Sequence, residues 1–332
     1  MQVKRQNIYL LLATALLSVS GCSSPEESGL ESVPIELRAS GEGEVETKTD
    51  ENGIDKEFAT RIFASKRDGD YTKLTTTVVD DEWYADTKVT TNGSIALSGN
   101  PVYPQYGDWL YLVAVAPKPT SYTDADAGVG YTLDGQTDIL YAKQIQGNRW
   151  DGSRFSKNTD NTVRPLEYTH QLTQLKFKAK KAADKGLTVK VKSITVKAVT
   201  SAMTLTLKDG NAAFTEPTDL ALTLAGDGTE IKSATAIDLG VLLLPPSTSD
   251  KAYKVTVDTS VGKFEDLSID FSSSNGSGSS NGSSGSGSAS GDYFAKGHSY
   301  EVTLNISDKE LEILSVTVAP WSSEDKGDLD LN

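Results

Sequence analysis

The chain has 332 residues, with 46 acidic against 32 basic side chains and a formal net charge of −14. This negative charge disfavours a nucleic-acid partner, because binding to a phosphate backbone relies on Lys and Arg. A single cysteine excludes a disulfide framework, so stability must come from packed cores, and the length is sufficient for about two domains.

The first residues have the pattern of a secretory signal with a lipidation site. Lys4 and Arg5 precede an apolar run over residues 8–17, which is shorter than the roughly 20 residues that a membrane-spanning helix needs. Val-Ser-Gly at residues 19–21 leads directly to Cys22, as in a lipobox. The alternative is an ordinary signal peptide with a cysteine nearby by chance.

These features predict a signal peptide over residues 1–21, a fatty-acyl lipid such as palmitate on Cys22, and a linker over residues 22–32. The acidic residues soon after Cys22 resemble the surface-export signals of lipoproteins in some Gram-negative bacteria. We therefore expect a protein that is lipid-anchored to the cell outer membrane and exposed on the surface.

After Cys22 the chain has the pattern of an all-β protein. Small polar and β-branched residues dominate, and no stretch sustains apolar residues at the spacing of an amphipathic helix. Short runs with a period of two recur along the chain, which is typical of β-sandwiches. We predict one β-sandwich domain over residues 33–185 and a second over residues 186–332.

The first predicted strand lies at residues 30–40, where Val33, Ile35 and Leu37 alternate with Pro34 and polar residues. Because proline has no backbone N–H, we expect this strand at the edge of a sheet. An acidic, glycine-containing stretch follows at residues 42–55 and is expected to be a flexible connection.

Further strands are expected in the first half at residues 58–65, 74–79, 88–97 and 109–116. The last of these is the strongest apolar run in this half. Because it is apolar on both faces, we expect a central strand buried on both sides. Residues 121–133 contain several carboxylates and are predicted to form a loop.

Alternating segments continue in the second half at residues 170–180, 187–198, 203–207, 253–257, 264–269, 302–306 and 311–318, and residues 238–244 form a second continuous apolar run. The alternation changes phase at Ser193 and near Ile313, which predicts a β-bulge or bend at each place. Residues 272–291 are almost entirely Ser, Gly and Asn, and we expect a flexible loop between two strands.

No residue pattern in the chain predicts catalysis. His170 and His298 each lie beside a predicted strand without Cys or His partners at metal-ligand spacing, so structural or surface roles are favoured and no metal or cofactor is expected. Asp124 and Asp126 could contribute to a calcium site, but the EF-hand spacing is absent and a solvated acidic loop is favoured.

Two features could bind or process carbohydrate. The paired Asp80 and Asp81 could act as glycosidic acid and base, although such pairs arise by chance in an acidic protein. A sugar-stacking face could be formed by Trp83, Tyr84, Tyr103, Tyr106 and Trp109. Packing in a core or an interface is the favoured use of these aromatic residues.

Five segments together resemble the fimbrillin, or Mfa-like, proteins that build type V pili. They are residues 33–37 after the lipobox, 138–142, 168–177, 297–304 and 315–321. The third spaces His170, Leu172, Leu175 and Phe177 as the family does, and the last ends on the family's terminal tryptophan. The resemblance covers almost the whole chain after Cys22.

This resemblance implies two tandem transthyretin-like (Greek-key) β-sandwich domains in a non-enzymatic pilus subunit, tip or anchor that supports cell adhesion. In the family the precursor reaches the outer surface as a lipoprotein, and a trypsin-like protease then cuts after a basic residue and releases the first strand. The groove that opens accepts a strand from another subunit. The implied partners are other pilus subunits, the protease, and the outer membrane through Cys22.

Carried over to this chain, the displaced strand has Val33, Ile35 and Leu37, and cleavage follows Arg38 or Lys48. Many relatives have arginine where this chain has Lys48, so the cut site and the occurrence of a cut stay open. The candidate donor residues are Leu314, Val316 and Val318, and the tail beyond them is the alternative.

Two other functions remain open on the sequence. A surface glycan-binding lipoprotein would use exposed aromatic residues on the loops of a sandwich. A glycosidase or other hydrolase would need an acid–base constellation, which the chain does not offer convincingly. A structural pilus subunit is the favoured hypothesis.

Overall fold

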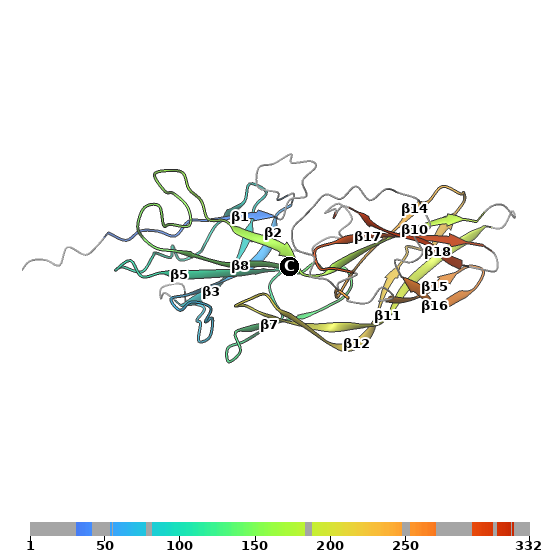
Figure 1. Cartoon of the computed structure of the whole chain (residues 1–332), viewed down its shortest axis with the longest axis horizontal. Helices are drawn as coiled ribbons and strands as arrows, with labels where there is room; N and C mark the ends of the chain where they lie inside the picture. The colour runs from blue at the N-terminus through green and yellow to red at the C-terminus, as the bar shows by residue number, and fades with distance from the viewer. Residues whose placement is uncertain are drawn as a thin grey trace, which may run out of the picture. The chain divides into compact units, whose positions relative to one another are not determined.

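The computed structural model describes residues 31–41, 54, 56–77, 82–182, 188–247, 253–269, 294–307, 311–319 and 321. Every regular element within these residues is a β-strand, which confirms the all-β prediction (Figure 1). In the described part of the chain no helix is long and apolar enough to cross a bilayer. Cys22, Lys48 and the Ser/Gly-rich residues 272–291 lie outside the described residues.

Seven strands of the first half pair into a closed barrel in the order β1-β4-β3-β2-β5-β8-β9, with β9 returning to β1. They are β1 (Leu37–Gly41), β2 (Phe58–Ser65), β3 (Trp83–Val89), β4 (Ser94–Ile95), β5 (Leu110–Ala116), β8 (Leu140–Gly147) and β9 (Leu166–His170). All neighbours in the barrel are antiparallel except β1 and β9, which run parallel.

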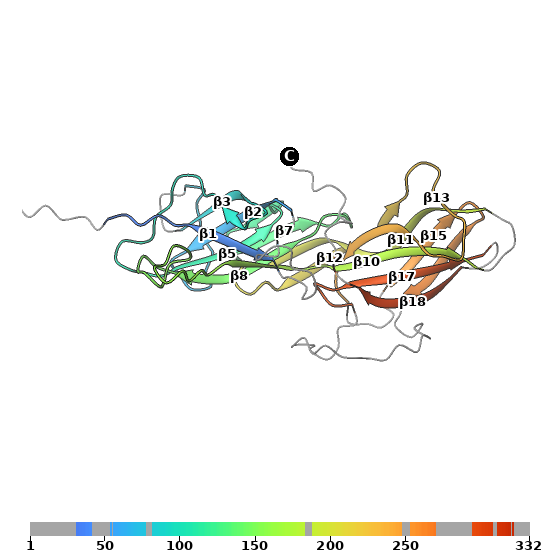
Figure 2. The ribbon, with the colours of Figure 1, turned by 90° about the horizontal axis from the view of Figure 1, so that it is seen from above.

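A four-stranded sheet follows the barrel in the chain, in the order β14-β10-β17-β18. Its strands are β14 (Ile237–Leu244), β10 (Thr173–Lys181), β17 (Ser299–Ile306) and β18 (Leu311–Ala319). β10 and β17 are parallel, while the other two pairs are antiparallel. Figure 2 shows β10, β17 and β18 side by side.

A seven-stranded sheet is built around the long strand β11 (Val189–Thr206). Its path is β16 (Lys263–Ile269), β15 (Tyr253–Thr259), β11, β7 (Gly128–Thr132) and β6 (Ser121–Thr123), and β12 (Ala212–Thr223) and β13 (Thr229–Ile231) also pair with β11. This sheet contains β6 and β7, which precede the predicted domain boundary at residue 185, together with strands that follow it. The boundary itself stays a prediction.

Three clusters of buried apolar side chains hold these layers together. One fills the barrel, one lies between the four-stranded sheet and the β15–β11 part of the seven-stranded sheet, and one packs the outer face of β2 and β5 against β7 and β11. Representative members, in the same order, are Leu112 and Trp83, Phe177 and Val255, and Val113 and Leu205.

The expected central strand is confirmed as β5. Leu110, Leu112 and Ala114 point into the barrel cluster, while Val113 and Val115 belong to the cluster on the outer face. Both faces of the strand are therefore removed from water, which explains its uninterrupted apolar sequence.

The loop predicted at residues 121–133 is wrong, because β6 and β7 lie there and form a hairpin. The carboxylates that suggested a loop lie in and beside the turn of this hairpin, and Gly130 in β7 allows the close approach of β6, since a Cβ on Gly130 would lie 2.4 Å from Ser121 Oγ. β12 was also not predicted, because most of its side chains are exposed and its position comes from backbone pairing with β11.

Both predicted irregularities occur. Buried positions in β11 switch phase between Val191 and Ile194, and the register of β17 and β18 shifts so that Leu314 has no paired residue. A second irregularity in β11, with Ala198 at φ 52°, was not foreseen. The sequence hid this site because Ala198 continues the alternation of Ile194 and Val196, whereas the structure exposes Ala198 and buries Val199.

Substitution of Gly210 tests the packing of the β11–β12 hairpin on β8. Gly210 has φ +68°, and a Cβ there would lie 2.5 Å from Cε1 of Tyr141, whose hydroxyl donates to Leu207 O at 2.9 Å. We expect Gly210→Ala to lower the free energy of unfolding by about 2–5 kcal/mol, from backbone strain plus overpacking. Denaturant unfolding measures it.

Gly152→Ala is the matched control, because Gly152 has a similar φ of +77° and a Cβ added there would meet no atom within 4 Å. Gly152→Ala should lower the free energy of unfolding only by the cost of the backbone strain, about 1–2 kcal/mol. Equal losses for the two variants would contradict the packing of Tyr141 on the hairpin.

A second prediction concerns acid stability of the barrel. Asp86 accepts from Arg61 Nε at 2.5 Å and Nη2 at 2.9 Å, and Lys118 Nζ lies 2.8 Å away. Burial raises the pKa of Asp86, but the hydrogen bonds and charges of Arg61 and Lys118 outweigh it and hold the pKa below its ordinary value. The stabilisation from ionised Asp86 is therefore fully present above the pKa that this carboxyl has in the unfolded chain. It is lost as the pH falls through the lower pKa that Asp86 has in the folded protein.

Asp86→Asn should lower the free energy of unfolding at pH 7 by about 1 kcal/mol, since the carboxylate is partly exposed and screened. The difference from the parent should shrink as pH falls through the pKa. Unfolding curves over pH measure this, with Glu57→Gln, from the exposed pair with Lys88, as a control that changes little. A pH-independent difference would rule out the ion pair as its cause.

Candidate functional site

Residues 33–41, which we call the N-terminal segment, have backbone partners along both edges. On one edge Tyr103 N donates to Val33 O at 2.9 Å, Ile35 N to Pro101 O at 2.8 Å, and Ala39 N to Gly93 O at 2.8 Å. β1 pairs with β4 on that edge. On the other edge the end of β1 runs parallel to β9.

The expected position at a sheet edge is therefore wrong for β1, which lies between β4 and β9. Pro34 does not interrupt these two ladders, because it precedes β1 and makes only an isolated bridge with Val102. The missing N–H of proline falls where the segment has a single backbone neighbour.

The inward side chains of the N-terminal segment are Ile35, Leu37 and Ala39, which are all buried in the barrel cluster. They alternate with exposed or half-buried residues, as expected for a strand with one face on a core. Burial of a Leu or Ile side chain contributes about 1.5–3 kcal/mol. Ile35 and Leu37 are therefore the main apolar anchors of the segment.

The outward side chains bind the segment only weakly. Glu36 forms an exposed ion pair with Lys157. Arg38 is exposed and its guanidinium donates to Asn92 O at 3.4 Å. Exposed pairs of this kind contribute about 0–1 kcal/mol, so the ladders and the inward apolar side chains hold the segment.

The two candidate cleavage residues differ in structural context. Arg38 lies inside β1 and is paired with Ser94, whereas Lys48 and the lipidation candidate Cys22 lie outside the described residues. A protease binds its substrate as an extended, accessible chain, so a cut after Arg38 would require β1 to leave its ladders first.

The candidate donor strand is β18, which pairs only with β17 and is the edge of its sheet. Val316 is buried in the sandwich core, Leu314 is half-buried at the bulge, and Val318 stands opposite Tyr300. The tail beyond Trp321 lies outside the described residues.

The two histidines occupy structural positions. His170 Nδ1 lies 2.7 Å from Oδ2 of the buried Asp138, and Trp321 stacks on the His170 ring at 3.9 Å between centroids. His298 is exposed and lies 3.1 Å from Lys296 O. Among the described residues no group of three or more His, Cys, Asp or Glu side chains is arranged to hold a metal.

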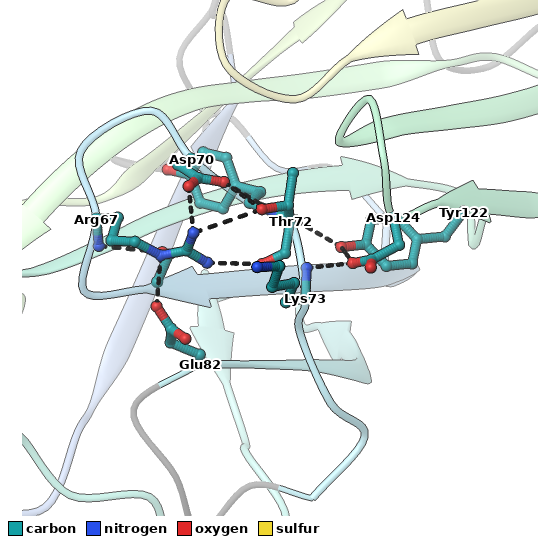
Figure 3. Close-up of polar contacts among 9 residues, drawn as sticks. Arg67, Asp70, Thr72, Lys73, Glu82, Tyr122 and Asp124 are labelled. Carbon is teal, nitrogen blue, oxygen red and sulfur yellow. Dashed lines mark hydrogen bonds and ion pairs between the residues drawn. The ribbon is translucent and has the colours of Figure 1, made fainter.

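A polar network centres on Arg67, in the turn after β2 (Figure 3). Its guanidinium donates to Glu82 Oε1 and Thr72 O, both at 2.8 Å, and to Asp70. The hydrogen bond to Glu82 raises the pKa of Arg67, and hydrogen bonds from Thr72 lower the pKa of Asp70. These groups bond to one another and fix the loop between β2 and β3.

Asp124 belongs to the same network and accepts from the backbone N–H of Lys73 (Figure 3). Tyr122 donates to Tyr71 O at 2.5 Å, and burial raises the pKa of Tyr122 to about 12. Asp124 thus ties the loop to β6. The paired Asp80 and Asp81 lie outside the described residues.

The aromatic residues that could have formed one sugar-stacking face are divided between the core and the surface. Trp83 is only 1% exposed and Tyr103 is also buried, so neither can stack on a ligand and both pack in the barrel cluster, which is the use that the sequence favoured. Tyr84 packs on Phe63 and Tyr122.

Tyr106 and Trp109 are exposed, by 81% and 38%. They are accompanied by Trp150, which is 53% exposed and was missed by the sequence analysis. A tryptophan between an arginine and an aspartate in a polar loop was the available signal.

Comparison with solved structures gives the same architecture. A proposed cell adhesion protein from Bacteroides uniformis matches with a TM-score of 0.54 and 18% identity, covering 88% of this chain and 99% of that chain. A proposed cell adhesion protein from Bacteroides ovatus matches with a TM-score of 0.54 and 15% identity, covering 87% and 97%. A fimbrial protein from Bacteroides vulgatus matches with a TM-score of 0.50 and 14% identity, covering 86% and 99%.

No curated protein sequence matches the chain. The fimbrillin-like family matches residues 47–321, which is most of the chain and begins beyond the end of β1 at Gly41. This match confirms the resemblance drawn from the five sequence segments. The chain belongs to the fimbrillin-like family.

Proposed function

We propose that this protein is a structural subunit, tip or anchor of a type V pilus that supports cell adhesion and is assembled by donor-strand exchange, without catalysis. The observation that carries the proposal is the position of the N-terminal segment. It fills the gap between β4 and β9 and places three apolar side chains in the barrel core. A strand held in this way can be replaced by another strand of matching pattern.

The candidate donor has that pattern. Ile35, Leu37 and Ala39 follow one another at intervals of two residues, and Leu314, Val316 and Val318 have the same spacing. Successive side chains of a strand point to opposite faces, so either triplet can present three apolar groups to one core. The backbone hydrogen bonds to β4 and β9 do not depend on the side chains of the strand that makes them.

Release of the donor is also supported by its position. β18 has one ladder to break, with β17, because it is the edge strand of its sheet. In the polymer it would gain two ladders, one with each side of the gap that the N-terminal segment now fills.

We further propose that the halves before and after about residue 185 are the tandem transthyretin-like domains that the resemblance implies, with β1 closing the first. The precursor would be carried to the outer membrane by a lipid on Cys22, and the N-terminal segment would protect the gap until arrival. The family match begins at residue 47, after β1, which supports the proposal that the residues before it are removed from the mature subunit.

Lys48 is the preferred cleavage residue in this proposal. A cut after Arg38 would leave Ala39–Gly41, which pairs with β9, in the barrel. A cut after Lys48 would remove the whole N-terminal segment together with the lipid. Lys48 also lies outside the paired residues of β1.

The cleavage step is tested by limited digestion of the full chain with a trypsin-like protease. We expect a product that begins at Thr49, and a fatty-acyl label on Cys22 that leaves with the N-terminal peptide. Lys48→Gln should block this product, and Arg38→Gln should not, as read by mass spectrometry. A product beginning at Ala39, unchanged by Lys48→Gln, would contradict the preference.

Polymerisation is tested on the cleaved protein by electrophoresis in SDS without heating. We expect a ladder of multimers from the cut chain and none from the uncut chain. Leu314→Asp should abolish the ladder, because it places a charge among apolar groups of the gap. Thr317→Asp, at an outward position of β18, is the matched control and should polymerise.

A cut protein that stays strictly monomeric at high concentration would contradict the stalk role. A ladder that Leu314→Asp leaves intact would contradict β18 as the donor and assign the role to the tail beyond it.

A further inference from the structure

Exposed aromatic side chains gather at the loops that join the start of β5 and the end of β8. The described residues include six large exposed hydrophobic side chains, and all except Val261 lie within residues 98–109 or 147–165. We call Tyr106, Trp109 and Trp150 the aromatic platform. Tyrosine and tryptophan are enriched at binding interfaces, because each combines a large apolar ring with a polar group.

The two loops are in contact. Leu110 pairs with Gly147, so the loops leave neighbouring strands side by side. Arg149 donates to Gln105 O, and the indole of Trp150 lies across Gly107, where a Cβ would be 2.2 Å from Nε1. The residues on both sides of Tyr106 therefore touch Arg149 and Trp150.

The loop that carries Trp150 is fixed by its own polar side chains. The buried Asn158 accepts from Gly152 N at 2.7 Å and donates to Thr162 O at 2.8 Å. Arg164 donates to Gly152 O at 2.9 Å and to Arg154 O at 3.0 Å.

Phe155 anchors this loop in the barrel core. Its side chain is fully buried and stacks on Tyr103, whose hydroxyl accepts from Phe155 N at 2.7 Å. A loop held in this way pays little ordering entropy when a ligand binds.

The charges around the platform favour an uncharged ligand. Arg149 donates to Gln105 O of the neighbouring loop, Arg154 and Arg164 donate to carbonyl groups of their own loop, and Lys157 pairs with Glu36. The nearest exposed ionic groups in the sequence are carboxylates, Asp108 beside Trp109 and Asp151 beside Trp150. These carboxylates can accept hydrogen bonds from the hydroxyl groups of a ligand and disfavour an anionic group beside them, while the Arg149 guanidinium lies 5.5 Å from the centroid of the Trp150 ring.

We propose that the aromatic platform binds a neutral glycan, with sugar rings stacked on Trp150 and Tyr106 and sugar hydroxyls hydrogen-bonded to the neighbouring carboxylates. A protein partner fits less well, because the core of such an interface is depleted of charge and here carboxylates alternate with the rings. The inference rests on the proposed adhesion role and names the class of its target.

The test is native electrophoresis of the full chain with Cys22→Ser in gels containing yeast mannan, xylan, laminarin or pig gastric mucin, with heparin and polysialic acid as anionic probes. We expect at least one neutral polysaccharide or mucin to retard the protein. Trp150→Ala and Tyr106→Ala should each lower the association constant at least tenfold. Val261→Ala, at the exposed hydrophobic residue that lies outside these two loops, should not change it.

Two glycine variants separate ring position from folding. Gly107→Ala should displace the Trp150 ring and weaken binding, whereas Gly226→Ala, which also has a positive φ and open space around it but lies outside both loops, should bind normally. Thermal unfolding midpoints show whether each variant is folded.

Absence of retardation by every neutral probe, or retardation unchanged by Trp150→Ala, would overturn the proposal. Retardation by the anionic probes alone would also overturn it, as would mucin binding that survives enzymatic removal of the glycans. The assay uses monomers, so platform variants that form normal SDS-resistant ladders without binding glycan would refute this inference and leave the pilus assignment standing.

Discussion

The barrel of this protein depends on one short strand that is hydrogen-bonded on both edges. β1 joins β4 to β9, and without it the order of the remaining six strands would end at those two strands. The backbone partners of the N-terminal segment and the core around Ile35 and Leu37 would then be exposed together. Unpaired strand edges beside an apolar core are strong templates for another strand.

This constraint explains why the residues and the backbone of the N-terminal segment have different roles. The inward residues supply apolar burial, the backbone supplies two ladders, and the outward residues contribute little. Such a segment is stable while it remains part of the chain, since its local concentration is high. Once the segment is cleaved off, a strand from another copy can make the same contacts. In the proposed assembly one strand therefore replaces another in the same position of the barrel.

Much of the architecture could be predicted from periodicity, and the failures have physical reasons. β2 and β5 were found because their apolar side chains are buried, and the bulge at Leu314 because the alternation changes phase there. β12 has few buried side chains and gave no signal. The position of β1 was misjudged because Pro34 suggested an edge, while long-range pairing with β9 leaves no mark in the local sequence.

The candidate sites were predicted unequally for the same reason. Alternation identified the inward residues of the N-terminal segment, because burial follows local spacing. The aromatic platform was recognised only in part: Tyr106 and Trp109 were among the candidates, but Trp150 comes from a second loop that only the β5–β8 pairing brings beside the first. Trp83 and Tyr106 look alike in the sequence, yet one fills the barrel and the other is exposed.

The central claim is that the gap between β4 and β9 exchanges its own strand for one from another copy. Disulfide formation tests it directly, with Cys22→Ser throughout, because opposed strand residues have the Cα separation that a disulfide needs. In the uncut chain, Arg38→Cys should link to Ser94→Cys within one molecule, as their pairing requires. After cleavage and assembly, Ser94→Cys should link instead to Ser315→Cys or Thr317→Cys of a second molecule. A link that stays within one chain after assembly would contradict the account.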